Sequence, residues 1–578
     1  MSTEVTRVPS LTPRERDVLV ALCAPCLDGD TFTEPSSIRA IAEALGVTQA
    51  AVKQHLLKLY AKFRLPDDGE RRRVRLANDA IALGIVERSD GGALEVSAAP
   101  DDAPASIKKA RAARALRSWH EAFAAFADAD AAGVLVQVTD LEAFGEAAWW
   151  SGHPQESVAA RLRAYAIHVE RGAECEAAMV ALDIAINYVT RRSMSVAGGW
   201  VSKASRHLAE QPERREQGHL AAIEALATLA QGDLETATTR ARAAVDIGTR
   251  YRDRDLVAMG HTFEACVLAR RGALDKAKVL FDEAMASAST GELGPFATGV
   301  VYCRTICTCL DLFDYRRASE WSQVVRECGN SHGADGFPGD CRAHGAAVLV
   351  HRGLWSAAVE EAQTACNETA TFDLGHTGLA SYELGVAQLR SGNLDAADEA
   401  FRKAHELGAD AEPGLSMLQL ARGETTSAAA SLSTALQQAA GDPLRRARLL
   451  PTYVDVAIAN ADLDKAQAAV TELAGIAHDY DSVVLSAAAA FATGRLAFLS
   501  GDLDTSAVNL RESNQLWLTV DAPYEGARAR LALGQTLAAQ KNTEAALLEL
   551  QAANAAFRRL GAHTEVNATA LAIEAITG

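Results

Sequence analysis

A helical unit that recurs about every 40 residues is the feature that most constrains the fold of this chain. Gly232, Gly272, Gly353 and Gly392 lie near multiples of 40 residues apart, a similar turn recurs at Gly501, and an alanine-rich run follows each turn. Glycine permits the left-handed turn between two helices, and small residues let neighbouring helices approach closely. The spacing therefore predicts a stack of helical hairpins, each of which buries its core against its neighbours.

The composition agrees with closely packed helices. Hydrophobic residues make up 49% of the chain but aromatic residues only 6%, so the predicted core is built from small side chains. The small residues expected between helices are Ala237, Ala277, Ala318, Ala358, Ala397, Ala466 and Ala507. Phe281, Trp321 and Phe401 are expected to fill the space between hairpins, and a degenerate unit is expected near Arg191 to Trp200.

Charge is distributed unevenly along the chain. The 578 residues hold 57 Lys+Arg against 75 Asp+Glu, a net charge of -18, which argues against nucleic-acid binding along the whole length. Residues 1–90, however, hold 13 residues of each sign, and residues 48–76 hold eight basic against three acidic residues. This local surplus of +5 leaves room for a small DNA-binding module in an otherwise acidic protein.

The N-terminal segment has the pattern of a helix-turn-helix. Thr12-Pro13 predicts a helix start, residues 36–45 predict a second helix, and Gly46 predicts a tight turn. Thr48 then caps a third helix over residues 48–63. On this helix Val52, Leu56, Leu59 and Phe63 face inward, while Gln49, Lys53, Gln54 and Lys58 face outward. The plainer alternative is an amphipathic helix with a solvated charged face.

The stretches LTPRERDVL, IRAIAEALGVTQAAVKQHLLKLYAKF and RLANDAIALGIV resemble the LuxR-type (GerE-like) DNA-binding domain over about 75 residues. The resemblance implies that Thr48 contacts a phosphate, that Val52, Lys53 and Gln54 face the groove, and that Lys58 follows the DNA backbone. Its fourth helix would cover Arg75 to Leu83. The loop before the second helix is longer than in that family, and the module is N-terminal rather than C-terminal. The predicted DNA contacts are Thr48, Gln49, Val52, Lys53, Gln54, Lys58, Arg71, Arg72 and Arg73.

The repeats resemble tetratricopeptide repeats in the longer form found in MalT-like regulators. The segments LEAFGEAAWWSGHPQESVAARLRAY, GELGPFATGVVYC and CRAHGAAVLVHRGLW further resemble the helical sensor region of actinobacterial LuxR-type regulators. This resemblance implies a superhelix with a concave face for a ligand or partner. No GxxxxGK[ST] motif is present, and GGWVSK at 198–203 lacks its spacing, so ATP-driven switching is not expected.

Two sets of cysteines have spacings that could carry chemistry. Cys23 and Cys26 could form a redox pair or pack as small apolar side chains. A second set could offer four zinc ligands, namely Cys328, His332, Cys341 and His344, with Cys303, Cys307 and Cys309 one hairpin earlier. The alternative for this set is packing inside helical hairpins, and no metal or cofactor is predicted.

Trp149, Trp150, Tyr165 and Trp200 could line an aromatic ligand pocket, although the core between the first repeats is the favoured interpretation. No catalytic arrangement of Ser, His and Asp, no phosphate loop and no HExxH motif is found, so the protein is not predicted to be an enzyme. Because no apolar run is long enough to span a membrane and no export segment is evident, a cytoplasmic protein with reduced thiols is expected.

The sequence thus predicts an all-α chain with a helix-turn-helix over 1–87, a linker over 88–107 and a repeat superhelix over 108–578. A short β-hairpin wing, Ile85 to Val86 with Leu94 to Val96, is a weaker expectation. The predicted function is a homodimeric transcriptional regulator that binds double-stranded DNA, with a repeat region that binds a protein, peptide or small-molecule effector. The alternatives are an interaction scaffold without DNA binding and a metal- or redox-responsive regulator. Operator, effector and direction of regulation are not specified.

Overall fold

The computed structural model describes residues 11–28, 35–63, 65, 71–82, 86–88, 94–96, 103–332, 338–371 and 373–577. The chain divides into two compact units. The first unit comprises Met1–Ile184, Trp200–Glu216 and Ile247–Arg254, and the second comprises Ala185–Gly199, Gln217–Asp246 and Asp255–Gly578. No helix within the described ranges is long and apolar enough to cross a membrane.

The N-terminal elements are α1 (Pro13–Asp28), α2 (Ile38–Leu45), α3 (Gln49–Lys62), α4 (Arg71–Ala82), β1 (Val86–Arg88) and β2 (Leu94–Val96). The helices that follow are α5 (Ala105–Ala115), α6 (Trp119–Ala131), α7 (Val138–Trp150), α8 (Pro154–Glu170), α9 (Glu174–Thr190), α10 (Met194–Leu208), α11 (Arg215–Gln231), α12 (Leu234–Tyr251), α13 (Arg254–Arg270), α14 (Leu274–Ser289), α15 (Pro295–Asp311), α16 (Tyr315–His332) and α17 (Pro338–His351). The remaining helices are α18 (Trp355–Thr369), α19 (Leu374–Arg390), α20 (Leu394–Glu406), α21 (Gly414–Ala421), α22 (Thr425–Gln438), α23 (Pro443–Ala459), α24 (Leu463–Asp479), α25 (Val483–Leu499), α26 (Leu503–Thr519), α27 (Pro523–Ala539), α28 (Thr543–Leu560) and α29 (His563–Thr577).

The N-terminal helices α1, α2 and α3 pack together, and a tight turn joins α2 to α3. Ser37 caps α2 by accepting a hydrogen bond from the Ala40 amide at 3.1 Å, and Thr48 caps α3 through the Ala51 amide at 3.3 Å. Gly46 has φ 64°, the left-handed conformation that favours glycine, and it ends α2 so that α3 can start at a new angle. Leu19, Leu22, Ile41, Leu56 and Leu59 fill the core between the helices.

The wing and the fourth helix are present with shifted bounds. β1 and β2 pair antiparallel, with Val86 opposite Val96, so the first strand begins one residue later than expected. α4 runs over Arg71–Ala82 and starts four residues before the expected Arg75. Together with α1, whose start follows Thr12 as expected, these elements form a helical module with a two-stranded hairpin.

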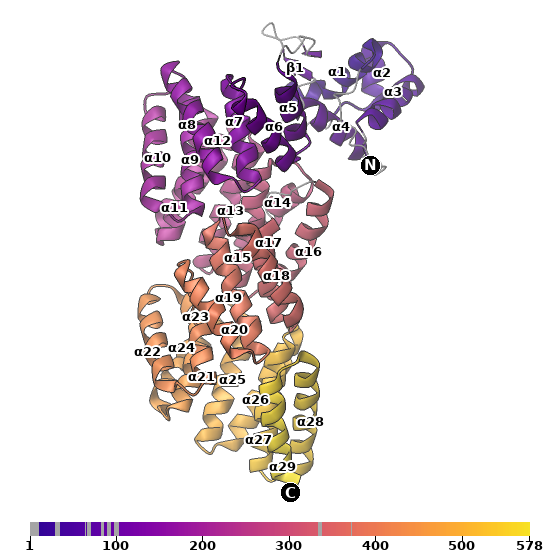
Figure 1. Cartoon of the computed structure of the whole chain (residues 1–578). Coiled ribbons are helices and arrows are strands. Elements are labelled where there is room, and N and C mark those ends of the chain that lie inside the picture. The colour runs from indigo at the N-terminus through magenta and orange to yellow at the C-terminus, as the bar shows by residue number, and fades with distance from the viewer. Residues whose placement is uncertain are drawn as a thin grey trace. The chain divides into compact units, whose positions relative to one another are not determined.

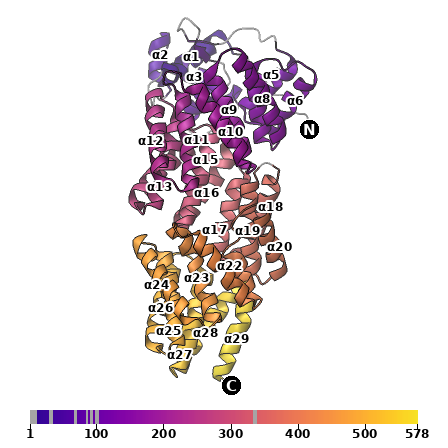
Figure 2. The ribbon, with the colours of Figure 1, turned by 90° about the vertical axis from the view of Figure 1, so that its left-hand side faces the viewer.

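The rest of the described chain is a series of helical hairpins. Successive helices pack in pairs, for example α25 with α26 and α27 with α28 (Figures 1 and 2). The five helices α23 to α27 each contain 17 residues, so the units are close to uniform in length. Gly392 at φ 86° and Gly501 at φ 81° confirm the predicted left-handed turns, and Arg192 at φ 57° takes this role in the degenerate unit.

The small residues predicted between helices are buried, and so are two of the three large ones. Ala237, Ala277, Ala318, Ala358, Ala397, Ala466 and Ala507 are all at most 3% exposed. Phe281 and Phe401 are at most 2% exposed, whereas Trp321 is only partly buried. Close helix packing therefore follows from the alanine positions, as the sequence predicts.

The second unit coils back on itself, because residues far apart in the sequence are in contact. Arg192 donates a hydrogen bond to the Gly408 carbonyl at 2.9 Å, and the Tyr480 hydroxyl donates to the Arg270 carbonyl at 3.1 Å. Arg352 contacts Asp521 at 3.2 Å. This coiling places the first helices of many hairpins around one interior space.

Candidate functional site

The outer face of α3 in the first unit carries the residues predicted to contact DNA. Gln49, Lys53, Gln54 and Lys58 are exposed on this face, as is the cap residue Thr48. The Thr48 oxygen accepts the hydrogen bond of the Ala51 amide, which leaves its hydroxyl hydrogen able to donate to a phosphate. These side chains offer donors for base edges and phosphates in a major groove.

Val52 is a correction to the predicted contacts. It is 0% exposed and packs in the helix-turn-helix core, so it does not reach a DNA groove. The physical reason is the helical period, which places Val52 on the same inward face as Leu56 and Leu59.

The arginines predicted to contact DNA from α4 are not all exposed side chains that are free of protein contacts. Arg72 donates to the Leu65 carbonyl at 2.7 Å, and its guanidinium lies 5.1 Å from the centroid of the Tyr60 ring. Arg72 thus helps to hold α4 against α3. Arg73 is half-buried, and the side chain of Arg71 lies outside the part that the structure describes.

The second unit contains an interior cavity of about 740 Å³. Its walls come mainly from the first helix of successive hairpins, α13, α15, α17, α19, α21, α23, α25 and α27, with α29 at one end. This volume lies in the range of about 300–1,000 Å³ that small-molecule sites occupy. The seven phenylalanine, tyrosine and tryptophan residues on its walls are Phe313, Tyr315, Trp355, Tyr382, Phe491, Trp517 and Tyr524.

Six charged side chains of the cavity form three pairs of opposite charge. Arg528 contacts Asp455 at 2.8 Å, and Arg445 contacts Asp410 at 2.7 Å. Arg390 contacts Glu525 at 3.2 Å and also lies over the Tyr524 ring. The two charges of each pair compensate one another, so these side chains attract a charged ligand only weakly.

Arg304 and Arg448 differ from these pairs. Within the described residues, the buried Nε of Arg304 has no hydrogen-bond partner. Arg448 lies 4.8 Å from the centroid of the Tyr382 ring, and among the described residues no carboxylate forms an ion pair with it. Arg304 is half-buried and Arg448 is exposed, and both line the cavity. They are two available cations of the cavity.

Burial disfavours the charged forms of the titratable groups near these two arginines. Burial raises the pKa of the Glu383 carboxyl to about 7, against the opposing charge of Arg448. Burial likewise raises the pKa of Asp311, although Arg448 and Arg304 oppose it. Burial lowers the pKa of His351 to about 4, so its imidazole is neutral at pH 7. The part of the cavity around Arg304 and Arg448 therefore suits an anionic group, and the aromatic walls suit an apolar or aromatic body.

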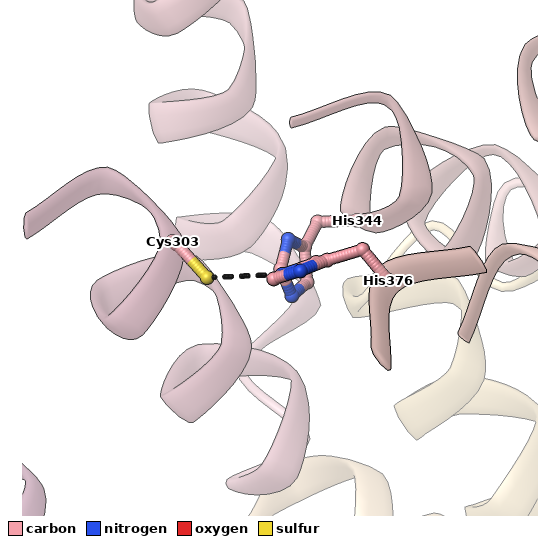
Figure 3. Close-up of side chains that lie close together, drawn as sticks. All are labelled: Cys303, His344 and His376. Atoms are coloured by element: carbon pink, nitrogen blue, oxygen red, sulfur yellow. Dashed lines mark hydrogen bonds between the residues drawn. The ribbon is translucent and has the colours of Figure 1, made fainter. Parts of the chain in front are cut away.

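Three potential metal ligands lie together beside the cavity (Figure 3). Cys303 of α15, His344 of α17 and His376 of α19 place their ligand atoms within 4.8 Å of one another. The Cys303 Sγ is 3.4 Å from the His376 Nε2, and the two imidazole rings meet edge to face at 5.7 Å between centroids. His344 also lines the cavity.

The cluster only partly overlaps the predicted zinc set. His344 belongs to both, whereas the side chains of Cys328, His332 and Cys341 lie outside the described residues. The sequence reasoning noted Cys303 but did not join it to His376. The available signal was the 41-residue step from Cys303 to His344, one repeat length, which puts both on equivalent first helices.

Cys23 of the other cysteine set is buried, and its thiol lies 3.8 Å from the Ala77 carbonyl oxygen. This environment fits the packing interpretation. The side chain of Cys26 lies outside the described residues, so the predicted redox pair is not tested.

The aromatic residues of the first repeats form two separate ring–ring contacts. Tyr165 meets Trp200 edge to face at 5.2 Å between centroids, and Trp150 lies 5.8 Å from Trp119. Trp149 and Trp150 are at most 9% exposed. The favoured interpretation as core between helices fits this burial.

No family model matches the chain, and no curated protein matches it in sequence. Among solved structures it is similar to the hetero-tetramer Cut9-Hcn1 of the APC/C, with 12% identity, 80% of this chain and 96% of that chain covered, and a TM-score of 0.35. It is also similar to a tetratricopeptide repeat protein from Parabacteroides merdae ATCC 43184, with 13% identity, 52% and 93% covered, and a TM-score of 0.23. Because these TM-scores are low, the fold assignment rests on the helical hairpins themselves.

Proposed function

We propose that this chain is a DNA-binding regulator of the LuxR type whose repeat region binds a small acidic effector. The observation that carries the proposal is the exposed polar face of α3, with Gln49, Lys53, Gln54 and Lys58, on a capped helix-turn-helix with its own core. One recognition helix reads only a few base pairs, so the regulator would bind DNA as a dimer. The role is binding rather than catalysis.

The effector in this proposal carries a carboxylate or phosphate. Arg304 and Arg448 would hold that group, and the aromatic walls would contact the rest of the molecule. Because helices from α13 to α29 line the cavity, an occupant contacts many hairpins at once and would stabilise one curvature of the array. A change of curvature is the physical route by which binding could alter the DNA-binding module.

The DNA-binding part is tested with the full-length chain and genomic DNA fragments at several salt concentrations. Lys53→Ala and Lys58→Ala should each weaken binding and lower the salt slope by about 1, because each removes one phosphate contact. Lys276→Ala, an exposed lysine of α14, serves as the control and should change neither. Direct DNA recognition by α3 is wrong if the two α3 variants behave like the control.

An interaction scaffold without DNA binding is the second candidate, and one residue favours it. Leu57 lies on α3 between Lys53 and Lys58 and is 59% exposed, which is unusual for a surface that contacts phosphates. If α3 instead binds a protein, Leu57→Ser should weaken that complex, and the wild-type chain should bind DNA no better than the Lys53→Ala variant does.

A further inference from the structure

We propose that Cys303, His344 and His376 form a binding site for a zinc-like divalent metal ion. The proposal stands on the second unit alone and does not depend on DNA binding. The three residues come from three first helices, α15, α17 and α19, that pack next to one another in the array. Figure 3 shows the Cys303 sulfur directed at the His376 ring, with the His344 ring beside it.

The ligand types suit zinc. One thiolate and two imidazoles are ligands that Zn²⁺ prefers, and three protein ligands with one open position are typical of sites that also bind water or a substrate group. With bonds of about 2.3 Å to sulfur and about 2.1 Å to nitrogen, ligand atoms of a tetrahedral site lie roughly 3.6 Å apart. The Cys303 Sγ and His376 Nε2 are 3.4 Å apart, and all three atoms lie within 4.8 Å, so small rotations of the side chains would complete the geometry.

A carboxylate behind one imidazole is the independent second observation. The His376 Nδ1 lies 3.0 Å from an Asp373 carboxylate oxygen, on the side of the ring away from Cys303. The other Asp373 oxygen accepts the His376 amide at 3.0 Å as the cap of α19, which fixes the position of the carboxylate. This contact does not have hydrogen-bond geometry in the structure, but with a metal bound a small rotation of the ring would let the carboxylate accept a hydrogen bond from Nδ1–H. Nε2 would then face the metal, an arrangement that metal-binding histidines commonly have.

The site would border the interior cavity, because His344 belongs to both. Metal binding would release the Cys303 thiol proton to solvent, and the thiolate would become the third protein ligand. The fourth position would hold water, or an anionic group of a molecule in the cavity.

The test uses the full-length chain, reduced and stripped with a chelator, and Co²⁺ as the spectroscopic probe for zinc. We expect one Co²⁺ per chain, visible bands of tetrahedral coordination and a thiolate-to-cobalt charge-transfer band, all removed by an excess of Zn²⁺. Cys303→Ser should abolish the charge-transfer band, and His376→Gln should weaken Co²⁺ binding at least tenfold. Cys307→Ser, one turn further along the same helix, is the matched control and should keep both the band and the affinity.

Asp373→Asn gives a separate readout of the supporting carboxylate. It should keep the charge-transfer band and weaken metal binding about 10–100-fold. Thermal unfolding of each variant shows whether it is folded, and the wild-type titration needs no variant at all. The proposal is overturned if the wild type binds no stoichiometric Co²⁺, or if folded Cys303→Ser keeps the band.

Discussion

The Lys62 ammonium at the end of α3 lies 2.6 Å from the carboxylate of Glu15 in the first turn of α1. Glu15 is only 2% exposed and also accepts the Thr12 amide at 2.7 Å, while the Thr12 hydroxyl accepts the Glu15 amide at 3.3 Å. This reciprocal capping box satisfies two free amides of the helix start. The Glu15 carboxylate therefore caps the first turn of α1 and also pairs with α3, the helix that carries the predicted DNA contacts.

Glu15→Gln should destabilise the N-terminal helices by about 1–3 kcal/mol, because it removes the buried carboxylate charge that pairs with Lys62. Burial raises the Glu15 pKa, but the hydrogen bonds from Lys62 and Thr12 outweigh it and hold the pKa at about 2. Since the folded pKa lies below the usual 4.5, this stabilisation is present above pH 4.5 and is lost as the pH falls towards 2. Hydrogen exchange of the α1 and α3 amides measures it. Asp17→Asn removes the exposed pair with Arg14 and should have little effect, and equal protection in both variants would contradict the prediction.

Arg304→Met should weaken ligand binding, whereas Arg390→Met should lower the stability of the second unit. Arg304 lacks an ion pair within the described chain, so its replacement should leave stability nearly unchanged and weaken binding of acidic cavity ligands by at least tenfold. Arg390 is paired with Glu525, and its loss leaves a carboxylate without its partner, which should cost about 3 kcal/mol. Urea unfolding and titration with a panel of small carboxylates and phosphates measure the two effects. A stability loss for Arg304→Met as large as for Arg390→Met would argue against an available cation.

The unliganded second unit should lose stability as the pH rises from 4.5 to about 7, owing to Glu383. Because burial raises the folded pKa of Glu383 to about 7, the folded carboxyl holds a proton in this range that the unfolded chain has released. Glu383→Gln should flatten this part of the stability curve, as followed by urea unfolding at several pH values. An unchanged slope in Glu383→Gln would show that the carboxyl is not protonated in the folded cavity.

Gly385→Ala should destabilise the second unit by about 1–3 kcal/mol through overpacking. An added Cβ at Gly385 would lie 2.6 Å from the ring of Phe401, which is fully buried and cannot move away. Gly475→Ala, in α24 with no atom near the added Cβ, is the matched control and should stabilise by about 0.5–1 kcal/mol. Phe401→Leu should reduce the cost of Gly385→Ala in the double variant, and strictly additive effects on urea unfolding would rule out the contact.

Much of the local structure could be read from the sequence. The cap residues Ser37 and Thr48, the left-handed Gly46 and the repeated glycine turns depend on neighbours a few residues away, so pattern and capping chemistry are enough to place them. The inward position of Val52 follows from the same helical period, and the family resemblance that put it in the groove was wrong on this residue.

The cavity and the metal cluster could not be read in the same way. Cys303 and His376 stand 73 residues apart, and Tyr480 meets Arg270 across 210 residues. Which residues face each other there depends on how far each hairpin rotates against the next, a quantity that no local pattern encodes.

The sequence by itself therefore determined the helices and their turns, because backbone hydrogen bonding and burial along one helix act over a few residues. Only the tertiary structure decided that Arg304 and Arg448 reach one interior space and that Cys303, His344 and His376 meet beside it. The physical reason is the packing of small side chains between hairpins, whose small rotations add up along the array until the second unit closes on itself.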